Sequence, residues 1–555
     1  MMKIPAPKLA LLLINFLILA VGLIGLIHLN KAFTDQQTVK FQDSSGEALH
    51  GTYMPGDLPI GVLLLEGFGS DQIAMRPAAR IFREAGAHIF TFDFSGHGRS
   101  DGSLGFDNAS TDRLAYQVIS AKETFKSSSG LSDDQILYFG HSLGARVAVQ
   151  SAVLDPAPPT ALILVGTQIN LGTNLQAEFF TGTSDAELDW VQSLDKNTPA
   201  ADILLFSGEW DDILTPHAAQ ALHDHLTKGS AGAERPFARK LTILPRLFHN
   251  YEIYSTRLLQ QALSQLDELG LMTTQRPVSF AGYYGFGALT LLGLFGTLIS
   301  APIYLIQSRP TIPAPPSSVK IRRLMTFIRG KLILWLVTVP AAVLLSGIFF
   351  LIPLGLPVFN MIYVGFIGGY GIVMWVLYRI GKVPGTEGKM PFKSTKKASP
   401  TSGIITLLGF LVWGLILLAC IIFTRSGLFY VISPNQRLVW LVIFTPFTAL
   451  GFWIGEKELL MLDAFRHKSG RRLTWASFTL AIVGLTPFFL YTLVMGFLGS
   501  LSGMLSGLHG LLILAIILLV GRLMKFFIHQ TWIVSLLQAA LLYALILPQG
   551  VLFAF

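Results

Sequence analysis

The sequence predicts two architectures in one chain: an α/β domain with a mostly parallel central sheet, and an all-α transmembrane bundle. Three observations favour this division. Residues 31–280 alternate short apolar runs with segments of helical spacing, while residues 9–29 and most of 281–555 form long apolar stretches. The charges divide in the same way. Residues 31–280 hold 18 Lys+Arg against 29 Asp+Glu, a net −11, and the other residues hold 23 against 4, a net +19.

The elements of the soluble segment follow one another along the chain. Short apolar runs typical of strands lie at 38–42, 48–54, 61–67, 88–94, 136–140, 161–167, 202–208 and 240–245. Segments of helical spacing lie at 76–86, 111–125, 142–153, 218–226 and 252–269. Almost fully apolar strands that alternate with helices predict a mostly parallel sheet covered on both faces, with the helices flanking it. About 250 residues suffice for one such domain.

Long apolar segments predict nine membrane spans. The first, residues 9–29, has about 21 residues without a formal charge, which at ~1.5 Å per residue crosses a ~30 Å hydrocarbon core. We expect residues 1–30 to be an uncleaved signal anchor; a cleaved signal peptide is the alternative, but no small-x-small cleavage site follows. Eight further spans are expected within a polytopic domain at 281–555, near 283–306, 332–353, 359–378, 403–423, 438–454, 473–497, 508–524 and 531–548.

The basic residues predict the orientation of these spans. With the N-terminus inside, 21 of the 23 basic residues outside 31–280 face the cytoplasm, and only Arg425 and Arg437 face the other side. The expected location is therefore a cytoplasmic membrane of bacterial type, with residues 31–280 and the C-terminus outside the cytoplasm. Residues 456–468 are expected to form a solvated cytoplasmic loop. The bilayer is an expected partner, whereas the acidic soluble segment would repel nucleic acid.

A sharp turn at residues 140–144, GHSLG, carries a candidate nucleophile, Ser142. It lies between an apolar run and a helical segment, where a strained turn lifts the hydroxyl above the sheet. Gly140 and Gly144 leave room for the turn, since a Cβ at either position would clash. The backbone N–H of Leu143 begins the following helix, where it can stabilise a developing oxyanion.

These residues resemble the α/β-hydrolase superfamily of serine hydrolases over roughly residues 38–275. The resemblance implies an α/β-hydrolase fold with a small cap, and a triad in the chain order serine, acid, histidine. The family's Gly-x-x-Asp spacing after the strand ending at Gly208 selects Asp211 as the acid. Spacing back from Pro216 selects Asp212, and the other aspartate would cap the helix that begins there. The base would be His249, after the last strand.

The resemblance also implies a second oxyanion donor and a substrate pocket. The donor would be the N–H of Phe68 in the sequence LLLEGFGSD, where Glu66 replaces a histidine common in the family. Glu66 could bind a cationic group of the substrate or hydrogen-bond to nearby backbone. Residues 168–200 occupy the position of the family's cap, so Phe179, Phe180 and Trp190 could line an acyl pocket or pack the core of the cap.

The expected function is that of a membrane-anchored, extracytoplasmic serine hydrolase acting through an acyl-enzyme. Its expected substrate is a carboxylic ester, either a small molecule or a lipid or lipid-linked ester near the bilayer surface. A serine peptidase of the prolyl-aminopeptidase type is the alternative enzyme. A non-catalytic ligand-binding sensor, or a transporter with a hydrolase-like outer domain, is the alternative of another class. No metal and no organic cofactor are expected, and the oligomeric state stays open.

Overall fold

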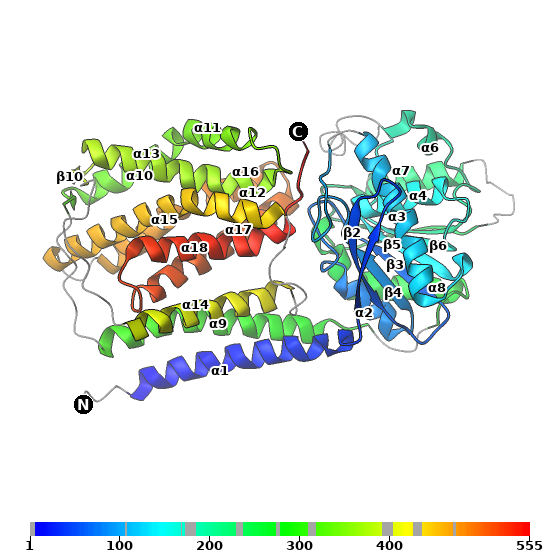
Figure 1. The fold of residues 1–555 in the computed structure, drawn as a ribbon, viewed down its shortest axis with the longest axis horizontal. Helices are drawn as coiled ribbons and strands as arrows, with labels where there is room; N and C mark the ends of the chain where they lie inside the picture. The colour runs from blue at the N-terminus through cyan, green and yellow to red at the C-terminus, as the bar shows by residue number, and fades with distance from the viewer. Residues whose placement is uncertain are drawn as a thin grey trace. The chain divides into compact units, whose positions relative to one another are not determined.

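The computed structural model describes residues 6–105, 108–167, 169–171, 185–228, 237–273, 278–308, 318–390, 403–425, 436–469 and 473–554. The chain forms two compact units (Figure 1). The helical unit comprises Met1–Leu29, Gly282–Val494 and Met504–Pro548, and the α/β unit comprises Asn30–Ala281, Met495–Gly503 and Gln549–Phe555. Two short segments from the C-terminal half therefore belong to the α/β unit, although the sequence analysis places them in the membrane domain.

The α/β unit is built on an eight-stranded sheet in the order β1-β2-β4-β3-β5-β6-β7-β8. The six strands from β4 to β8 in this order run parallel, and β1 and β2 add an antiparallel edge beside β4. The predicted fold class is therefore confirmed. The strands are β1 (Gln37–Gln42), β2 (Ala48–Met54), β3 (Gly61–Leu65), β4 (His88–Phe92), β5 (Ile136–His141), β6 (Ala161–Val165), β7 (Asp202–Gly208) and β8 (Arg239–Leu244).

Helices connect the parallel strands and flank the sheet (Figure 1). Every residue of β3, β5 and β6 is buried, because these central strands are covered on both faces, and this burial explains their unbroken apolar sequences. The α-helices of this unit up to residue 281 are α2 (Arg76–Glu84), α3 (Asn108–Ser129), α4 (Leu143–Leu154), α6 (Asp189–Gln192), α7 (Pro216–Thr227) and α8 (Thr256–Glu268). The crossovers bring the C-terminal ends of β5, β7 and β8 to one edge of the sheet, where ligands bind in open α/β folds.

In the described residues, six helices are long and apolar enough to cross a membrane, or seven if the bent pair α10–α11 is one span. The bend in this pair is 41°. The described apolar part of α16 and the whole of α18 are shorter than these spans. The helices are α1 (Ala6–Leu29), α9 (Ala281–Ser308), α10 (Leu324–Val337), α11 (Val339–Phe349), α12 (Val358–Tyr363), α13 (Gly369–Ile380), α14 (Gly403–Arg425), α15 (Gln436–Ser469), α16 (Leu473–Phe497), α17 (Leu501–Met524) and α18 (Thr531–Ile546). These long apolar helices indicate association with a membrane.

The helical unit contains buried charges that the apolar pattern does not reveal. Residues 456–468 continue α15 as a helix, so the expectation of a solvated loop there is wrong. Glu458 is fully buried, pairs with Lys331 of α10, and accepts hydrogen bonds from Tyr370 at 3.2 Å and Tyr378 at 3.0 Å. A buried carboxylate needs such partners to offset its lost hydration.

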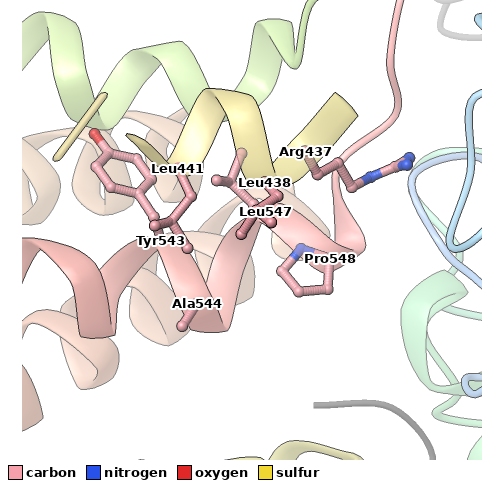
Figure 2. A pocket seen from close by; sticks show the side chains of 7 residues that line it. All are labelled: Arg437, Leu438, Leu441, Tyr543, Ala544, Leu547 and Pro548. Atoms are coloured by element: carbon pink, nitrogen blue, oxygen red, sulfur yellow. The ribbon is translucent and has the colours of Figure 1, made fainter. Parts of the chain in front are cut away.

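The helical unit also contains a largely apolar pocket between α15 and α18. Side chains such as Leu441 and Tyr543 line this pocket (Figure 2).

Candidate active site

Ser142 occupies the turn between β5 and α4 in a strained backbone conformation. Its φ of 55° and ψ of −118° lie outside the regions that L-residues favour. The glycines on either side make this turn possible: a Cβ on Gly144 would overlap the backbone oxygens of Leu65 and Glu66, and one on Gly140 would overlap the first turn of α4. The sequence expectation for both glycines therefore has a direct steric basis.

Three of the predicted residues come together at this turn. His249 Nε2 lies 3.0 Å from Ser142 Oγ, and His249 Nδ1 lies 2.7 Å from Asp211 Oδ2. All three side chains are buried. Ser142 follows β5, Asp211 follows β7, and His249 opens a 3₁₀ helix, His249–Tyr254, beyond β8. The parallel sheet thus gathers residues that are far apart in the sequence.

The two adjacent aspartates have separate partners. Asp211 Oδ1 accepts the backbone N–H groups of Ile213 at 2.9 Å and Leu214 at 2.7 Å, which leaves Oδ2 facing His249. Asp212 instead accepts hydrogen bonds from residues 500–502 of the same compact unit. Thr215 caps α7 through the N–H of Ala218, so the expectation that one aspartate caps that helix is wrong.

The two expected oxyanion donors lie on segments that border Ser142. Leu143 is the first residue of α4, where the helix dipole is positive. The loop after β3 passes beside the serine: a Cβ built on Gly67 would lie 3.2 Å from Ser142 Cβ and 3.0 Å from His141 Nδ1. Phe68 follows in that loop, and its side chain is 43% exposed.

The predicted pocket residues have different outcomes. Glu66 is 0% exposed and its Oε1 accepts the N–H of Phe94 at 3.0 Å, which is the hydrogen bond to nearby backbone that was the second of its two expected roles. The carboxylate thereby joins the loops after β3 and β4. Trp190 is buried beneath Arg146 of α4, 5.4 Å from its ring centre, and Arg146 pairs with Asp185, so Trp190 packs against α4. Phe179 and Phe180 lie outside the described residues.

Sequence reasoning missed two buried groups beside the histidine, His141 and Glu252. Glu252 Oε1 accepts the N–H of Gly208 at 2.7 Å, while Oε2 lies 3.5 Å from His141 Nε2 and 3.7 Å from His249 Nδ1. His141 Nε2 also lies 3.1 Å from the carbonyl oxygen of His249. His141 is the variable residue of the GHSLG turn and Glu252 is one 3₁₀ turn after His249, so neither position carried a signal in the sequence.

Burial sets the charge of both groups. Burial, and after it the neighbouring His249, lowers the pKa of His141 to about 3, so that imidazole is neutral. Burial and the nearby Asp211 raise the pKa of Glu252 well above its usual range, which favours the protonated form of this carboxyl group more than in an exposed glutamate. One imidazole nitrogen each of His141 and His249 and a carboxylate oxygen of Glu252 lie within 4.8 Å of one another, a spacing that could suit a metal ion. Hydrogen bonds already engage both imidazoles, however.

The loop after β4 is held by another buried carboxyl group, Asp93. It accepts the backbone N–H groups of Gln72 and Arg99 at 2.9 and 2.8 Å, and the side chain of Gln72 at 2.8 Å. Burial, with Asp71 adding to it, raises the pKa of Asp93 to about 6. Asp93 therefore fixes the loop that faces the Phe68 loop.

Comparison with known proteins agrees with this arrangement. Residues 60–193 match the family model Hydrolase_4, described as serine aminopeptidase S33. The α/β unit is an α/β-hydrolase domain. The matched segment includes β3, the Phe68 loop and the Ser142 turn. Its strands belong to the eight-stranded sheet of the α/β unit. The family match and the fold support a hydrolase.

Two curated relatives of this chain come from Mycobacterium tuberculosis: the uncharacterized proteins Rv2307c of strain H37Rv and MT2364 of strain CDC 1551. Each is 27% identical over 217 residues, which is 38% of this chain and 72% of the relative.

Similar solved structures include the α/β hydrolase GrgF from Penicillium sp. sh18, at 18% identity and a TM-score of 0.33, covering 42% of this chain and 98% of that one. The esterase Pf2001 of Pyrococcus furiosus is similar at 15% identity and a TM-score of 0.35, covering 43% and 93%.

Proposed function

We propose that this protein is a membrane-associated serine hydrolase that cleaves carboxylic esters through an acyl-enzyme. The observation that carries the proposal is the continuous hydrogen-bonded array from Ser142 Oγ through His249 to Asp211, with distances of 3.0 and 2.7 Å. The array begins on a serine held in a strained turn, as a nucleophile on this fold requires. A ligand-binding sensor or a transporter domain has no need for such an array.

The proposed reaction has two steps. Ser142 Oγ attacks the ester carbonyl carbon while His249 Nε2 takes the hydroxyl proton, and the N–H groups of Leu143 and Phe68 stabilise the oxyanion. The intermediate then collapses: the bond to the alkoxy oxygen breaks, and His249 gives its proton to the departing alcohol. In the second step water attacks the acyl carbon while His249 takes a proton from it; the bond between the acyl carbon and Ser142 Oγ then breaks, His249 returns the proton to Oγ, and the acid leaves. Asp211 keeps His249 in the required tautomer and stabilises the imidazolium.

The proposed substrate is an ester rather than a peptide. A peptide's charged amino terminus would have given Glu66 a role, but Glu66 is fully buried and hydrogen-bonded to Phe94. The apolar helices favour an ester of a lipid or a lipid-linked alcohol, because they would hold the enzyme at a bilayer. A serine peptidase is the second candidate, since the matching family model is described as serine aminopeptidase.

Steady-state kinetics on the full chain in detergent separate these candidates. We expect turnover of a p-nitrophenyl acyl ester and of a monoacylglycerol, with at least 100-fold lower kcat/KM for a proline p-nitroanilide. The Ser142→Ala variant is the matched control and should lose about 10⁶-fold in kcat, the order found when a triad serine is removed. The reverse substrate preference would establish the peptidase. No turnover of either substrate class by the wild type would overturn the proposal.

A further inference from the structure

A segment from the far end of the sequence forms part of the hydrolase domain. Residues 551–554 run beside the loop that follows β4, within the same compact unit. Leu552 donates its N–H to the carbonyl of Gly96 at 2.8 Å and accepts the N–H of Leu104 at 2.8 Å. Ala554 donates its N–H to the carbonyl of Leu104 at 3.1 Å, and Leu104 and Phe553 form a parallel β-bridge. The segment is thus held by three backbone hydrogen bonds to Gly96 and Leu104 in the loop after β4.

The neighbouring sequence is adapted to this contact. Gly96 has a φ of +72°, and a Cβ there would lie 2.7 Å from the carbonyl oxygen of Leu552. A side chain at this position would therefore be strained and would push the segment away. Val551, Leu552 and Phe553 are buried as deeply as core residues of the sheet.

Phe553 contacts the residue that is expected to carry an oxyanion donor. Its side chain is 1% exposed, and its ring centre lies 5.8 Å from that of Phe68. Phe68 also meets the ring of His97 at 6.4 Å, edge to face. The loop bearing Phe68 is thus flanked by the Ser142 turn near Gly67 and by Phe553 and His97 at the Phe68 ring.

A second segment of the C-terminal half joins the same unit next to Asp211. Asp212 accepts the hydroxyl of Ser500 at 3.0 Å and the backbone N–H of Ser502 at 3.2 Å. Because Ser502 is the second residue of α17, the carboxylate caps the N-terminus of that helix. Residues from the C-terminal half therefore contact the domain close to Asp211 as well as at Phe68.

We propose that Phe553 is a positioning residue for the hydrolase reaction: it holds the Phe68 loop so that the Phe68 N–H meets the oxyanion. The inference rests on the proposed function, because it assigns the Phe68 loop its role there. It makes the catalytic competence of residues 30–281 dependent on a segment that follows the last α-helix, α18. Segment 551–554 stays in place beside the Phe68 loop and takes no part in proton transfer.

The test compares Phe553→Ala with Val551→Ala, which removes a buried side chain from the same segment and leaves the Phe553 ring in place. Both variants are made in the full chain, and kcat, KM, the thermal unfolding midpoint and the affinity for a trifluoromethyl ketone are measured. The ketone forms a tetrahedral adduct whose oxyanion needs the same donors. Loss of a complete oxyanion donor lowers kcat by about 10²–10³-fold, so we expect a 10- to 100-fold loss for Phe553→Ala.

In Phe553→Ala, KM should stay within threefold of wild type, and the ketone's inhibition constant should rise by the same factor as kcat falls. Val551→Ala should keep kcat within threefold, and Phe553→Leu should recover most of the loss by refilling the space. Equal kcat in the Phe553→Ala and Val551→Ala variants would overturn the inference, as would a kcat loss with unchanged ketone affinity. Wild-type activity tells the two proposals apart: an inactive wild type defeats the proposed function, whereas an active wild type with active Phe553→Ala defeats only this inference.

Discussion

Replacing Asp211 by asparagine should disable the histidine rather than merely weaken its orientation. Asp211 Oδ1 is fixed by the backbone N–H groups of Ile213 and Leu214, which only an oxygen can accept. The asparagine amide must therefore place its oxygen there and its NH₂ group 2.7 Å from His249 Nδ1, where Oδ2 now lies. An NH₂ donor forces Nδ1 to be the acceptor and leaves the proton on Nε2, facing Ser142. His249 then cannot accept the serine proton.

The expected loss in kcat is about 10⁴-fold, because the same exchange has an effect of this size when it imposes the wrong tautomer in a Ser-His-Asp triad. This loss corresponds to roughly 5.4 kcal/mol of activation free energy. The assay is ester hydrolysis by the full chain at pH 7.5, with the unfolding midpoint as a check on folding. Asp212→Asn is the matched control, since Asp212 contacts Ser500 and Ser502 instead, and it should stay at least 100-fold more active than Asp211→Asn. A larger loss for Asp212→Asn, or equal losses, would refute this assignment of the acid.

Three further expectations follow from the buried groups and the charge pattern. Glu252→Gln should keep kcat/KM within fivefold of wild type between pH 6 and 8, because burial and Asp211 raise the pKa of Glu252 and so favour the neutral form that glutamine mimics; a 100-fold loss would contradict this. The pKa of Asp93 is raised to about 6 in the folded chain, so the folded state binds this proton more tightly than the unfolded state does. The stability of wild type relative to Asp93→Asn should therefore fall by about 2–3 kcal/mol as the pH rises from 4 to 7. Unfolding midpoints of both proteins at pH 4 and 7 measure this change, and a difference that is constant with pH would contradict it. In a Cys420→Ala background, an impermeant maleimide should label Asp57→Cys but not Ser399→Cys in intact cells, and the opposite pattern would reverse the expected orientation.

The sequence was sufficient for the elements and the chain order of the site, because local patterns encode both. The strand predicted at 48–54 coincides with β2. The mostly apolar sequence of β5 predicts that both faces of this strand are buried, and every residue of β5 is buried. The GHSLG turn marked Ser142, and the chain order implied by the resemblance to the α/β-hydrolase superfamily then marked Asp211 and His249. Adjacent aspartates share every local property, so only the backbone N–H groups around Asp211 separate it from Asp212.

What the sequence could not provide were contacts between segments far apart in the chain and the environments of charged side chains. Glu66 is adjacent to the Phe68 loop in the sequence, but the direction of its side chain depends on the N–H of Phe94 in the loop after β4. The burial of Glu252 depends on β7 and on the Ser142 turn together. The contact of Phe553 with Phe68 joins opposite ends of the chain, and no periodicity or motif marks it.

The central claim is that Ser142 is the nucleophile, and covalent labelling with a fluorophosphonate probe tests it most directly. The full chain in detergent is treated with the probe, digested, and mapped by mass spectrometry. We predict one adduct on the peptide containing Ser142, absent in Ser142→Ala and strongly slowed in Asp211→Asn. An unlabelled wild type with an unfolding midpoint that shows it to be folded, or an adduct that persists in Ser142→Ala, would contradict the account.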